Sequence, residues 1–406
     1  MDSVFLTLNA GSSSIKFAVF TPSAGELEQL ASGQIEGLGA RATFSVRSSG
    51  DQQAFELAGR IDHGAAVGAI LGWLRKTRLD RRVVAVGHRV VHGGVDFTAP
   101  VVVDDSVLAK LRNLIALAPL HQPHNIAGID AATHAFSGAV QVACFDTAFH
   151  RSHPFVADTF ALPRRFYDEG IRRYGFHGLS YEFISRRLRS VAPALSSGRI
   201  IVAHLGNGAS MCAIRDGKSV ASTMGFTALD GLPMGTRCGQ LDPGVVLYFM
   251  AEKGMDVQAI SRLLYHESGL KGLSGISHDM RELEAAGSKA ANDAIAYFVA
   301  RIRREIGGLA AAIGGLDAVV FTGGIGENSA HIREAVLDDM GWIGITIDQV
   351  ANNKGAQVIS ADGSKVALLV VKTDEERMIA EHTAEIVKLV NGDAKNPQLP
   401  TNRVSA

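Results

Sequence analysis

Two segments about two hundred residues apart share one pattern, and this repeat constrains the fold more than any other feature. Residues 7–19 (TLNAGSSSIKFAV) and residues 204–216 (HLGNGASMCAIRD) each read as an apolar strand, a turn of Gly, Ser and Asn, and a second apolar strand. In the alignment Gly11 matches Gly208 and Ser13 matches Ser210. A supersecondary unit that recurs in this way indicates two related domains facing each other, although two unrelated β-hairpins could also look this similar.

Strands and helices alternate along the rest of the chain, which is typical of an α/β protein. Strand patterns fall within residues 28–58, 82–86 and 142–146 and at the start of 316–328, and helical patterns cover about 64–76, 104–117, 287–312 and 375–390. The stretch 151–174 is irregular, with two prolines and several arginines, so we place the main domain junction there.

The totals exclude several classes of protein. With 406 residues and a net charge of −1, the chain predicts two domains and gives no sign of nucleic-acid or membrane partners. The first residues lack the pattern of a signal peptide, and no apolar run is long enough to span a bilayer. The three cysteines are far apart, which fits a reducing compartment and predicts a cytoplasmic protein.

Glycine-rich turns follow three apolar strands, at Asn9–Ser14, Gly206–Ser210 and Gly323–Asn328. Ligands of α/β proteins bind at the carboxyl ends of strands, so these turns are candidate phosphate sites. None of them matches the P-loop pattern, and GGIGEN lacks the full dinucleotide fingerprint. Two phosphate hairpins with a glycine-rich strand-to-helix turn are the arrangement of actin-like ATPases.

Eight segments in register identify a family. NAGSSSIK, GHRVVHGG, FDTAFH, YGFHG, HLGNGAS, MGTRCGQLDPG, FTGGIGEN and TDEE occur in this order from residue 9 to residue 376 and together resemble the acetate kinases. The resemblance implies a duplicated actin/sugar-kinase/Hsp70-like two-domain α/β fold with the active site in the interdomain cleft. It also implies direct in-line transfer of the ATP γ-phosphoryl to acetate, with Mg²⁺ (or Mn²⁺) as cofactor, ATP/ADP as co-substrate and a homodimeric assembly.

The same resemblance suggests domain boundaries. Residues 1–150 with 377–396 would form an N-terminal domain that carries the first phosphate hairpin and the acyl-binding loops. Residues 151–376 would form the nucleotide-binding domain, and 397–406 a flexible tail.

The chemistry of the acceptor explains two arginines. A carboxylate acceptor is already ionised near neutral pH, so it needs neutralisation more than a general base. Arg89 and Arg237 lie in loops rich in glycine and small residues, and arginine can bind both the carboxylate and the phosphoryl group in transfer.

The resemblance assigns the remaining site residues. Asp146, His177 and Asn207 would act in catalysis together with these arginines, and His121 is a further candidate. The nucleotide and its phosphates would be bound by Ser12, Ser14, Lys16, His204, Gly206, Asn207, Gly208, Asp279, Arg281, Gly324, Ile325 and Asn328. Asn9 and Glu375 would bind the metal, with Glu376 as the alternative to Glu375.

The acyl pocket would be lined by Val91, Leu120, Phe176 and Ala228, beside Arg89. Acetate kinases commonly have proline where this chain has Ala228. The smaller alanine could leave a roomier methyl pocket, so propionate stays open as the preferred acceptor. Gln122, His124, Leu179 and Tyr181 also depart from the usual pattern without replacing a role that we can name.

Three other classes compete with an acyl kinase. An actin-like ATPase would keep the phosphate hairpins but would not need the two arginines and a small apolar pocket. A sugar kinase would use Asp146 as the base for an uncharged hydroxyl. A zinc hydrolase could be built on the pairs His121/His124 and His150/His153, but neither pair has a neighbouring Glu or Cys in the usual frame.

Overall fold

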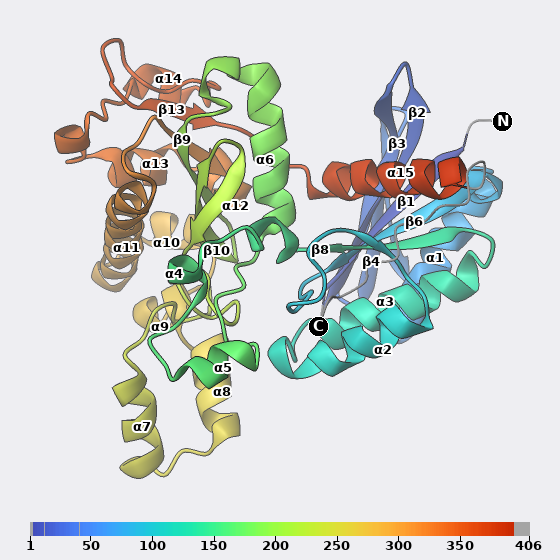
Figure 1. Ribbon diagram of the computed structural model, residues 1–406, viewed down its shortest axis with the longest axis horizontal. Helices are drawn as coiled ribbons and strands as arrows, with labels where there is room; N and C mark the ends of the chain where they lie inside the picture. Colours follow the sequence, from blue (N-terminus) through green and yellow to red (C-terminus); the bar gives the residue numbers. More distant parts are fainter. Residues whose placement is uncertain (1–2, 12, 40, 394–406) are drawn as a thin grey trace. The chain divides into compact units, whose positions relative to one another are not determined.

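The protein is described here by a computed structural model, in which residues 3–11, 13–39 and 41–393 are described. These residues form two compact units, which divide between Ala148 and Phe149 and again between Thr373 and Asp374. Unit 1 therefore combines the first part of the chain with its last helix, and unit 2 is the middle of the chain (Figure 1). The predicted tail at 397–406 and the predicted phosphate ligand Ser12 lie outside the described residues.

The described part of unit 1 contains one sheet with the strand order β5-β4-β3-β2-β1-β6-β8-β7. Strand β1 is antiparallel to β2 and parallel to β6, and β6 is parallel to β8. The strands are β1 (Val4–Ala10), β2 (Ser14–Ser23), β3 (Glu26–Glu36), β4 (Ala42–Ser48), β5 (Asp51–Leu57), β6 (Val83–Val90), β7 (Val101–Val102) and β8 (Val140–Phe145).

Helices cover both faces of this sheet, because alternate residues of the central strands are apolar on both sides. On one face, Leu6 and Leu8 pack in a cluster with residues of α1 (His63–Lys76) and α3 (Gln122–Ala135). On the other face, Phe5 packs against α15 (Glu375–Asp393). The helix expected at 104–117 ends earlier, as α2 (Asp105–Asn113), and continues as a 3₁₀ turn at Leu114–Leu117.

Unit 2 repeats the central part of this topology. Its described sheet has the order β11-β10-β9-β12-β13, in which β9 is antiparallel to β10 and parallel to β12. This is the order and sense of β3-β2-β1-β6-β8 in unit 1, so the predicted duplication is confirmed. The strands are β9 (Arg199–Leu205), β10 (Ala209–Arg215), β11 (Lys218–Ser222), β12 (Ala318–Thr322) and β13 (Ala367–Val370).

The long helices α6 (Gly178–Val191) and α11 (Lys289–Ile313) pack on the sheet of unit 2. The stretch expected to be irregular, 151–174, contains two short helices, α4 (Phe155–Asp158) and α5 (Arg164–Asp168). The other helices are α7 (Pro243–Ala251), α8 (Val257–His266), α9 (Gly269–Ser274), α10 (Met280–Ala286), α12 (Gly323–Asn328), α13 (Ala330–Leu337) and α14 (Gln349–Asn353). None of the helices in the described ranges has the length and apolar character that crossing a membrane requires.

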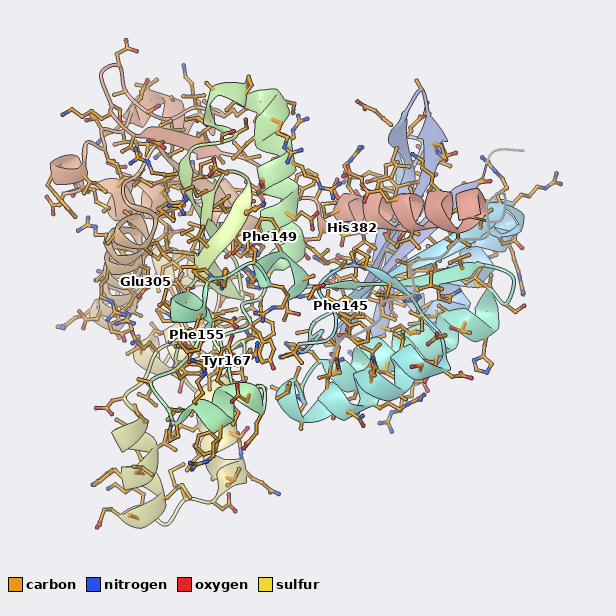
Figure 2. The ribbon with its side chains drawn as sticks, viewed as in Figure 1. Phe145, Phe149, Phe155, Tyr167, Glu305 and His382 are labelled. Atoms are coloured by element: carbon orange, nitrogen blue, oxygen red, sulfur yellow. The ribbon has the colours of Figure 1, made fainter. Side chains whose placement is uncertain are left out.

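Aromatic side chains fill the layers between sheets and helices. Phe145 lies at the end of β8 (Figure 2). It is buried in a cluster with Phe97 and residues of α2 and α3, and its ring stacks on that of Phe97 with a centroid distance of 4.8 Å. In unit 2, Phe155 of α4 meets Tyr167 of α5 edge to face, and this contact holds the two short helices together. The strand ends that carry polar residues therefore rest on rigid cores.

Two fully buried histidines predict how stability depends on pH. Burial lowers the pKa of both His88 and His150 to about 4. The unfolded chain takes up protons at these rings below pH 6.5, whereas the folded protein does so only near pH 4, so acid favours unfolding in this window. We expect each ring to cost about 2 kcal/mol of stability between pH 7 and pH 5. Urea unfolding at the two pH values measures this loss, and His88→Gln should reduce it. An equal loss in that variant would contradict the assignment.

Candidate active site

Three neighbouring parallel strands of unit 1 end in polar residues. Asn9 and Arg89 are the second-last residues of β1 and β6, and Asp146 directly follows β8. Because β1, β6 and β8 are adjacent and parallel, their carboxyl ends meet at one edge of the sheet. Glu375, the first residue of α15, reaches the same edge. The structure thus brings together four residues that the sequence analysis singled out separately.

Arg89 is the centre of this group. Its Nε and Nη2 atoms donate to the two carboxylate oxygens of Asp146 at 3.0 and 2.6 Å, and its Nη1 donates to Oδ1 of Asn9 at 3.1 Å. The carboxylate of Glu375 lies 3.9 Å from Nε. Burial alone would lower the pKa of Arg89, but the charges of Asp146 and Glu375 outweigh it and raise that pKa. The guanidinium is therefore a fixed positive charge in an orientation set by three oxygen-bearing side chains.

Glu375 and Glu376 occupy different environments. Glu375 forms the ion pair with Arg89 and keeps 17% of its side chain exposed. Burial, and then the charge of Glu375, raise the pKa of Glu376, while Lys16 opposes this rise. Lys16 itself is exposed on β2, opposite Asn9 in the strand register. Of the two carboxylates, Glu375 is the one that forms an ion pair with Arg89, which also bonds to Asn9.

The first glycine-rich turn is held by residues that sequence reasoning missed. Gly11 donates its backbone N–H to the carbonyl of Ser14 at 2.8 Å, which closes the turn between β1 and β2. Nε2 of His63 contacts the carbonyl oxygen of Gly11 at 2.7 Å, and the His63 ring stacks on His124. Buried Asn125 donates to the carbonyl of Ala10, the last residue of β1. Asn125 is a polar residue on the buried face of α3, and this placement was the one sequence signal that could have indicated its role.

The same asparagine also positions the acyl-pocket candidate Val91. Oδ1 of Asn125 accepts the backbone N–H of Val91 at 2.9 Å, and the Val91 side chain is buried directly after β6. Leu120 is partly buried just before α3, next to His121, which forms the N-cap of that helix. The other two pocket candidates belong to unit 2: Phe176 is buried, and Ala228 is partly buried.

The second glycine-rich turn organises the candidates of unit 2. Gly206 donates its N–H to the carbonyl of Gly208 at 3.1 Å, which closes the turn between β9 and β10. A Cβ atom on Gly208 would lie 3.2 Å from Nε2 of His177 and 4.0 Å from Nη1 of Arg237. The carbonyl of Asn207 accepts the N–H of Gly235 at 3.3 Å. This turn therefore brings His177 and Arg237 together.

His177 has an unusual backbone and a defined side chain. It is the N-cap of α6 with φ 57°, in the left-handed region, which costs a residue with a Cβ atom about 1–2 kcal/mol. Its ring stacks on that of His204 with a centroid distance of 4.4 Å. Nδ1 of His177 contacts the hydroxyl of Ser210 at 2.8 Å, and Tyr181 also bonds to this hydroxyl.

Other side-chain contacts position His204 and Arg237. Nδ1 of His204 contacts the Ser180 hydroxyl at 2.9 Å, which in turn bonds to Thr373 beyond β13. Nη1 of Arg237 donates to the carbonyl of Ala228 at 3.0 Å. This contact joins Arg237, a catalytic candidate, to Ala228, the acyl-pocket candidate that stands where acetate kinases commonly have proline.

The third turn, from Gly323 to Asn328, folds as α12 directly after β12. Gly323 has φ +77°, and a Cβ atom there would come within 2.8–3.1 Å of the Leu205 backbone, so only glycine fits. Oε1 of Glu327 accepts the N–H groups of Gly323 and Thr373 at 2.9 and 3.1 Å. Glu327 was not among the predicted site residues. Its carboxylate stabilises the turn by accepting these backbone N–H groups.

One of the remaining nucleotide candidates, Asn328, lines a cavity. Gly324 and Ile325 belong to the first turn of α12, and Asn328 lines a cavity of about 420 Å³ together with Glu284, Asn292, Ile295, Ser329, Ala330 and His331. Asp279 caps α10 and forms a two-point pair with Arg281, whose side chain is 88% exposed. The hydrogen bond from Arg281 lowers the pKa of Asp279 to about 2. In this arrangement the two side chains bind each other.

The histidine pairs show other contacts than those of a zinc site. His150 and His153 both bond to the hydroxyl of Ser219, and His124 stacks on His63. Within residues 3–11, 13–39 and 41–393, no group of three or more His, Cys, Asp or Glu side chains has the geometry to hold a metal ion. The oxygen atoms of Asn9 and Glu375 suit Mg²⁺, which accepts few protein ligands and retains several waters.

Comparisons with known proteins agree on one family. A profile of the acetokinase family matches residues 4–381. The acetate kinase of Methylocella silvestris is 60% identical over 398 residues, which cover 95% of this chain and 98% of that protein. The acetate kinase of Nitrobacter hamburgensis is 52% identical over 392 residues, covering 95% of this chain and 96% of that one.

Solved structures give the same result. The crystal structure of Porphyromonas gingivalis acetate kinase matches with a TM-score of 0.86 and 40% identity, covering 95% of this chain and all of that one. A propionate kinase from Francisella tularensis matches with a TM-score of 0.89 and 36% identity, covering 94% of this chain and 99% of that one.

Proposed function

The chain belongs to the acetokinase family, and from this premise we propose that it reversibly transfers the γ-phosphoryl group of ATP to acetate, giving acetyl phosphate and ADP. The observation that carries this proposal is the two-point pair of Arg89 with Asp146. It holds a permanent cation at a strand edge, which suits an anionic acceptor.

The same pair argues against a sugar kinase. A hydroxyl acceptor must lose a proton to a carboxylate base in the course of transfer. Both oxygens of Asp146 accept hydrogen bonds from Arg89, and the side chain is buried, so this carboxylate is engaged in orienting a cation. A carboxylate acceptor needs no such base, because it is ionised at neutral pH.

In the proposed reaction, a carboxylate oxygen of acetate attacks the γ-phosphorus as the bond to the β–γ bridging oxygen breaks. The electron pair of that bond leaves on ADP, and no proton has to move. Arg89 binds the acetate carboxylate, and Arg237 and His177 donate to the oxygens of the phosphoryl group in transfer. Asp146 orients Arg89, and the side-chain amide of Asn207 donates to the same phosphoryl group.

The nucleotide is proposed to bind through the glycine-rich turns and the residues around them. Gly206, Gly208 and His204 would contact phosphates, and Ser12, Ser14 and Lys16 of the first turn would do so as well. The cavity lined by Asn328 offers room for the base, and Gly324 and Ile325 of the same helix, α12, would also contact the nucleotide. Asp279 and Arg281 would contact the ribose after their mutual pair opens.

For the metal we propose Mg²⁺, or Mn²⁺ in its place, bound by Asn9 and Glu375. The bound ion would neutralise charge on the ATP phosphates. Because Glu375→Gln removes one negative charge from the site, we expect it to raise the Mg²⁺ concentration for half-maximal activity about 10-fold or more. Titration of activity with MgCl₂ measures this, and Glu376→Gln is the matched control. A larger shift in the control would assign the metal to Glu376.

Acetate is proposed as the preferred acceptor, with propionate as the alternative. One methylene group in an apolar pocket changes binding by about 1–3 kcal/mol. Ala228→Pro should fill the pocket and raise the ratio of kcat/KM for acetate to that for propionate about 10-fold. An unchanged ratio would show that residue 228 does not line the acyl pocket.

A homodimer is proposed from the character of α7. This helix, PGVVLYFMA, is almost wholly apolar, yet none of its residues is buried, and Leu247 is 66% exposed. An apolar helix that stays largely exposed in its own chain suits a surface that a second copy covers. Sedimentation velocity should give twice the 43.0 kDa chain mass, and Leu247→Asp should shift it to the monomer.

A cytoplasmic location is also proposed. Cys144, Cys212 and Cys238 form no disulfide within the part of the chain that the structure describes, which suits a reducing compartment. Fractionation of cells with an antibody to the protein would test the location, and recovery in the periplasm would contradict it.

The reaction is tested by ADP release with Mg-ATP and a panel of acceptors, with hydroxylamine present to trap acyl phosphate. The panel is no acceptor, formate, acetate, propionate, butyrate and glucose. Hydroxamate from acetate or propionate is the expected result. ADP release that no acid changes would indicate an ATPase, and release stimulated by glucose a sugar kinase.

A further inference from the structure

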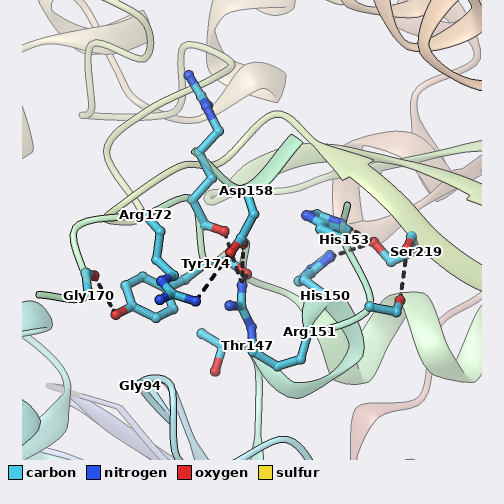
Figure 3. Close-up of polar contacts among 12 residues, drawn as sticks. Gly94, Thr147, His150, Arg151, His153, Asp158, Gly170, Arg172, Tyr174 and Ser219 are labelled. Atoms are coloured by element: carbon cyan, nitrogen blue, oxygen red, sulfur yellow. Dashed lines mark hydrogen bonds and ion pairs between the residues drawn. The ribbon is translucent and has the colours of Figure 1, made fainter. Parts of the chain in front are cut away.

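We infer that His150, Ser219 and His153 form a positioning network that holds the left-handed backbone of His177. This inference rests on the proposed function, because it concerns a residue proposed to act on the phosphoryl group. His150 ends the segment FDTAFH, of which the reaction itself used only Asp146. All members of the network belong to unit 2, and Figure 3 shows His150 and His153 beside Ser219.

The network reaches His177 through the peptide plane that precedes it. Nε2 of His150 contacts the carbonyl oxygen of Phe176 at 3.0 Å. That carbonyl and the backbone nitrogen of His177 lie in one rigid peptide plane, and φ of His177 is the rotation next to it. The bond from His150 therefore fixes the orientation of the peptide plane between Phe176 and His177, and so helps to hold His177 at its strained φ of 57°.

Close packing reinforces this bond. Gly175, two residues before His177, also has a positive φ of 72°, and a Cβ atom there would lie 2.6 Å from the His150 ring. The ring thus lies directly against the Gly175 backbone, which only glycine permits. The carbonyl of Gly225 accepts the N–H of Tyr174 at 3.0 Å and holds the other side of this segment.

The hydrogen positions follow from donor and acceptor types. A carbonyl only accepts, so Nε2 of His150 carries its proton, and Nδ1 of the neutral ring accepts from the Ser219 hydroxyl at 2.8 Å. The Ser219 oxygen then accepts from Nε2 of His153 at 2.7 Å. Nδ1 of His153 is buried without a hydrogen-bond partner among the described residues, which agrees with a ring that carries its proton on Nε2. Every proton between His153 and Phe176 is accounted for.

Burial keeps both rings neutral. It lowers the pKa of His150 to about 4 and that of His153 to about 2. The charge of Arg151 also lowers the pKa of both rings. Tyr181 from α6 faces His150, and Cys212 from β10 faces Ser219. A neutral His150 keeps one donor for Phe176 and one acceptor for Ser219, which is the pairing that the contacts require.

The test compares two replacements of His150. Glutamine can place an N–H group near the position of Nε2, whereas leucine cannot. Since a displacement of about 1 Å in a catalytic group can cost about 100-fold in rate, we expect His150→Leu to lower kcat about 100-fold with little change in KM for ATP. His150→Gln should stay within about 5-fold of the wild type. Equal losses in both variants would overturn the inference.

A double variant separates positioning from general damage. If His150 acts through His177, His150→Leu should lower kcat no further in a His177→Ala background. The same 100-fold loss in both backgrounds would indicate a purely structural role. Should His150→Leu fail to fold, Ser219→Ala serves instead, with an expected loss of about 10-fold. Ser152→Ala is its matched control, because the Ser152 hydroxyl bonds to the backbone carbonyl of Ser219 and not to its side chain.

A spectroscopic readout makes the test independent of activity. In protein labelled at histidine, the ring signals of His177 should shift in Ser219→Ala and stay in place in Ser152→Ala. Unmoved His177 signals in Ser219→Ala would overturn the inference even if the wild type forms acetyl phosphate. A wild type that forms none, with the shift present, would overturn the proposed reaction alone.

Discussion

Replacement of Arg237 with alanine should lower kcat for acetyl phosphate formation about 1,000-fold, while the affinity for ATP changes only a few-fold. An arginine that stabilises the phosphoryl group in transfer contributes about 10³ or more to the rate. Nη1 of Arg237 lies near the Gly208 turn and His177, and its bond to the Ala228 carbonyl orients the side chain. Steady-state kinetics and calorimetric titration with ATP give the two quantities.

Two further variants make this result specific. Arg237→Lys keeps the charge but loses the planar fork of donors, so it should recover only part of the activity. Arg215→Ala removes an exposed arginine from the other end of β10, away from the Gly208 turn, and should leave kcat unchanged. Near-wild-type turnover in Arg237→Ala would remove Arg237 from the phosphoryl-transfer step.

The fold was predictable because short local sequence patterns indicate its strands, turns and helices. The repeated strand, turn and strand at residues 7–19 and 204–216 became β1–β2 and β9–β10, each beside a parallel strand. Apolar runs with turn residues at their ends identify such units without any knowledge of distant contacts. The short helices α4 and α5 were missed, because prolines and arginines mark a break but do not say how the chain passes it.

The contacts that support the site were less accessible to sequence reasoning. Asn125 reaches Ala10 across 115 residues, and Ser180 reaches Thr373 across 193. Side chains that bond to a distant backbone leave no periodic pattern, so only the folded chain reveals them. The left-handed conformation of His177 is a similar case, because residues with a Cβ atom rarely adopt it and no sequence signal marks it.

The pair of Arg89 and Asp146 supplies the second large effect. Arg89→Ala should lower kcat about 1,000-fold, since it removes the cation that we propose binds the acceptor, and Asp146→Asn should lower it about 100-fold or more. Because the two side chains act as one unit, the double variant should be no slower than Arg89→Ala. Losses that multiply in the double variant would contradict the shared role.

Stability should respond to the same pair in a different way. Asp146 is buried, and 19% of the Arg89 side chain is exposed, so Asp146→Ala leaves a poorly solvated charge and should cost about 3 kcal/mol in urea unfolding. Arg199 and Asp317 also form a bidentate pair, at the opposite end of β9 from His204. Both of these side chains are more exposed than those of Arg89 and Asp146. Asp317→Asn should therefore cost less stability and leave kcat unchanged. A loss of activity there would mean that kinase activity follows stability, and that the Arg89–Asp146 pair has no special role in the reaction.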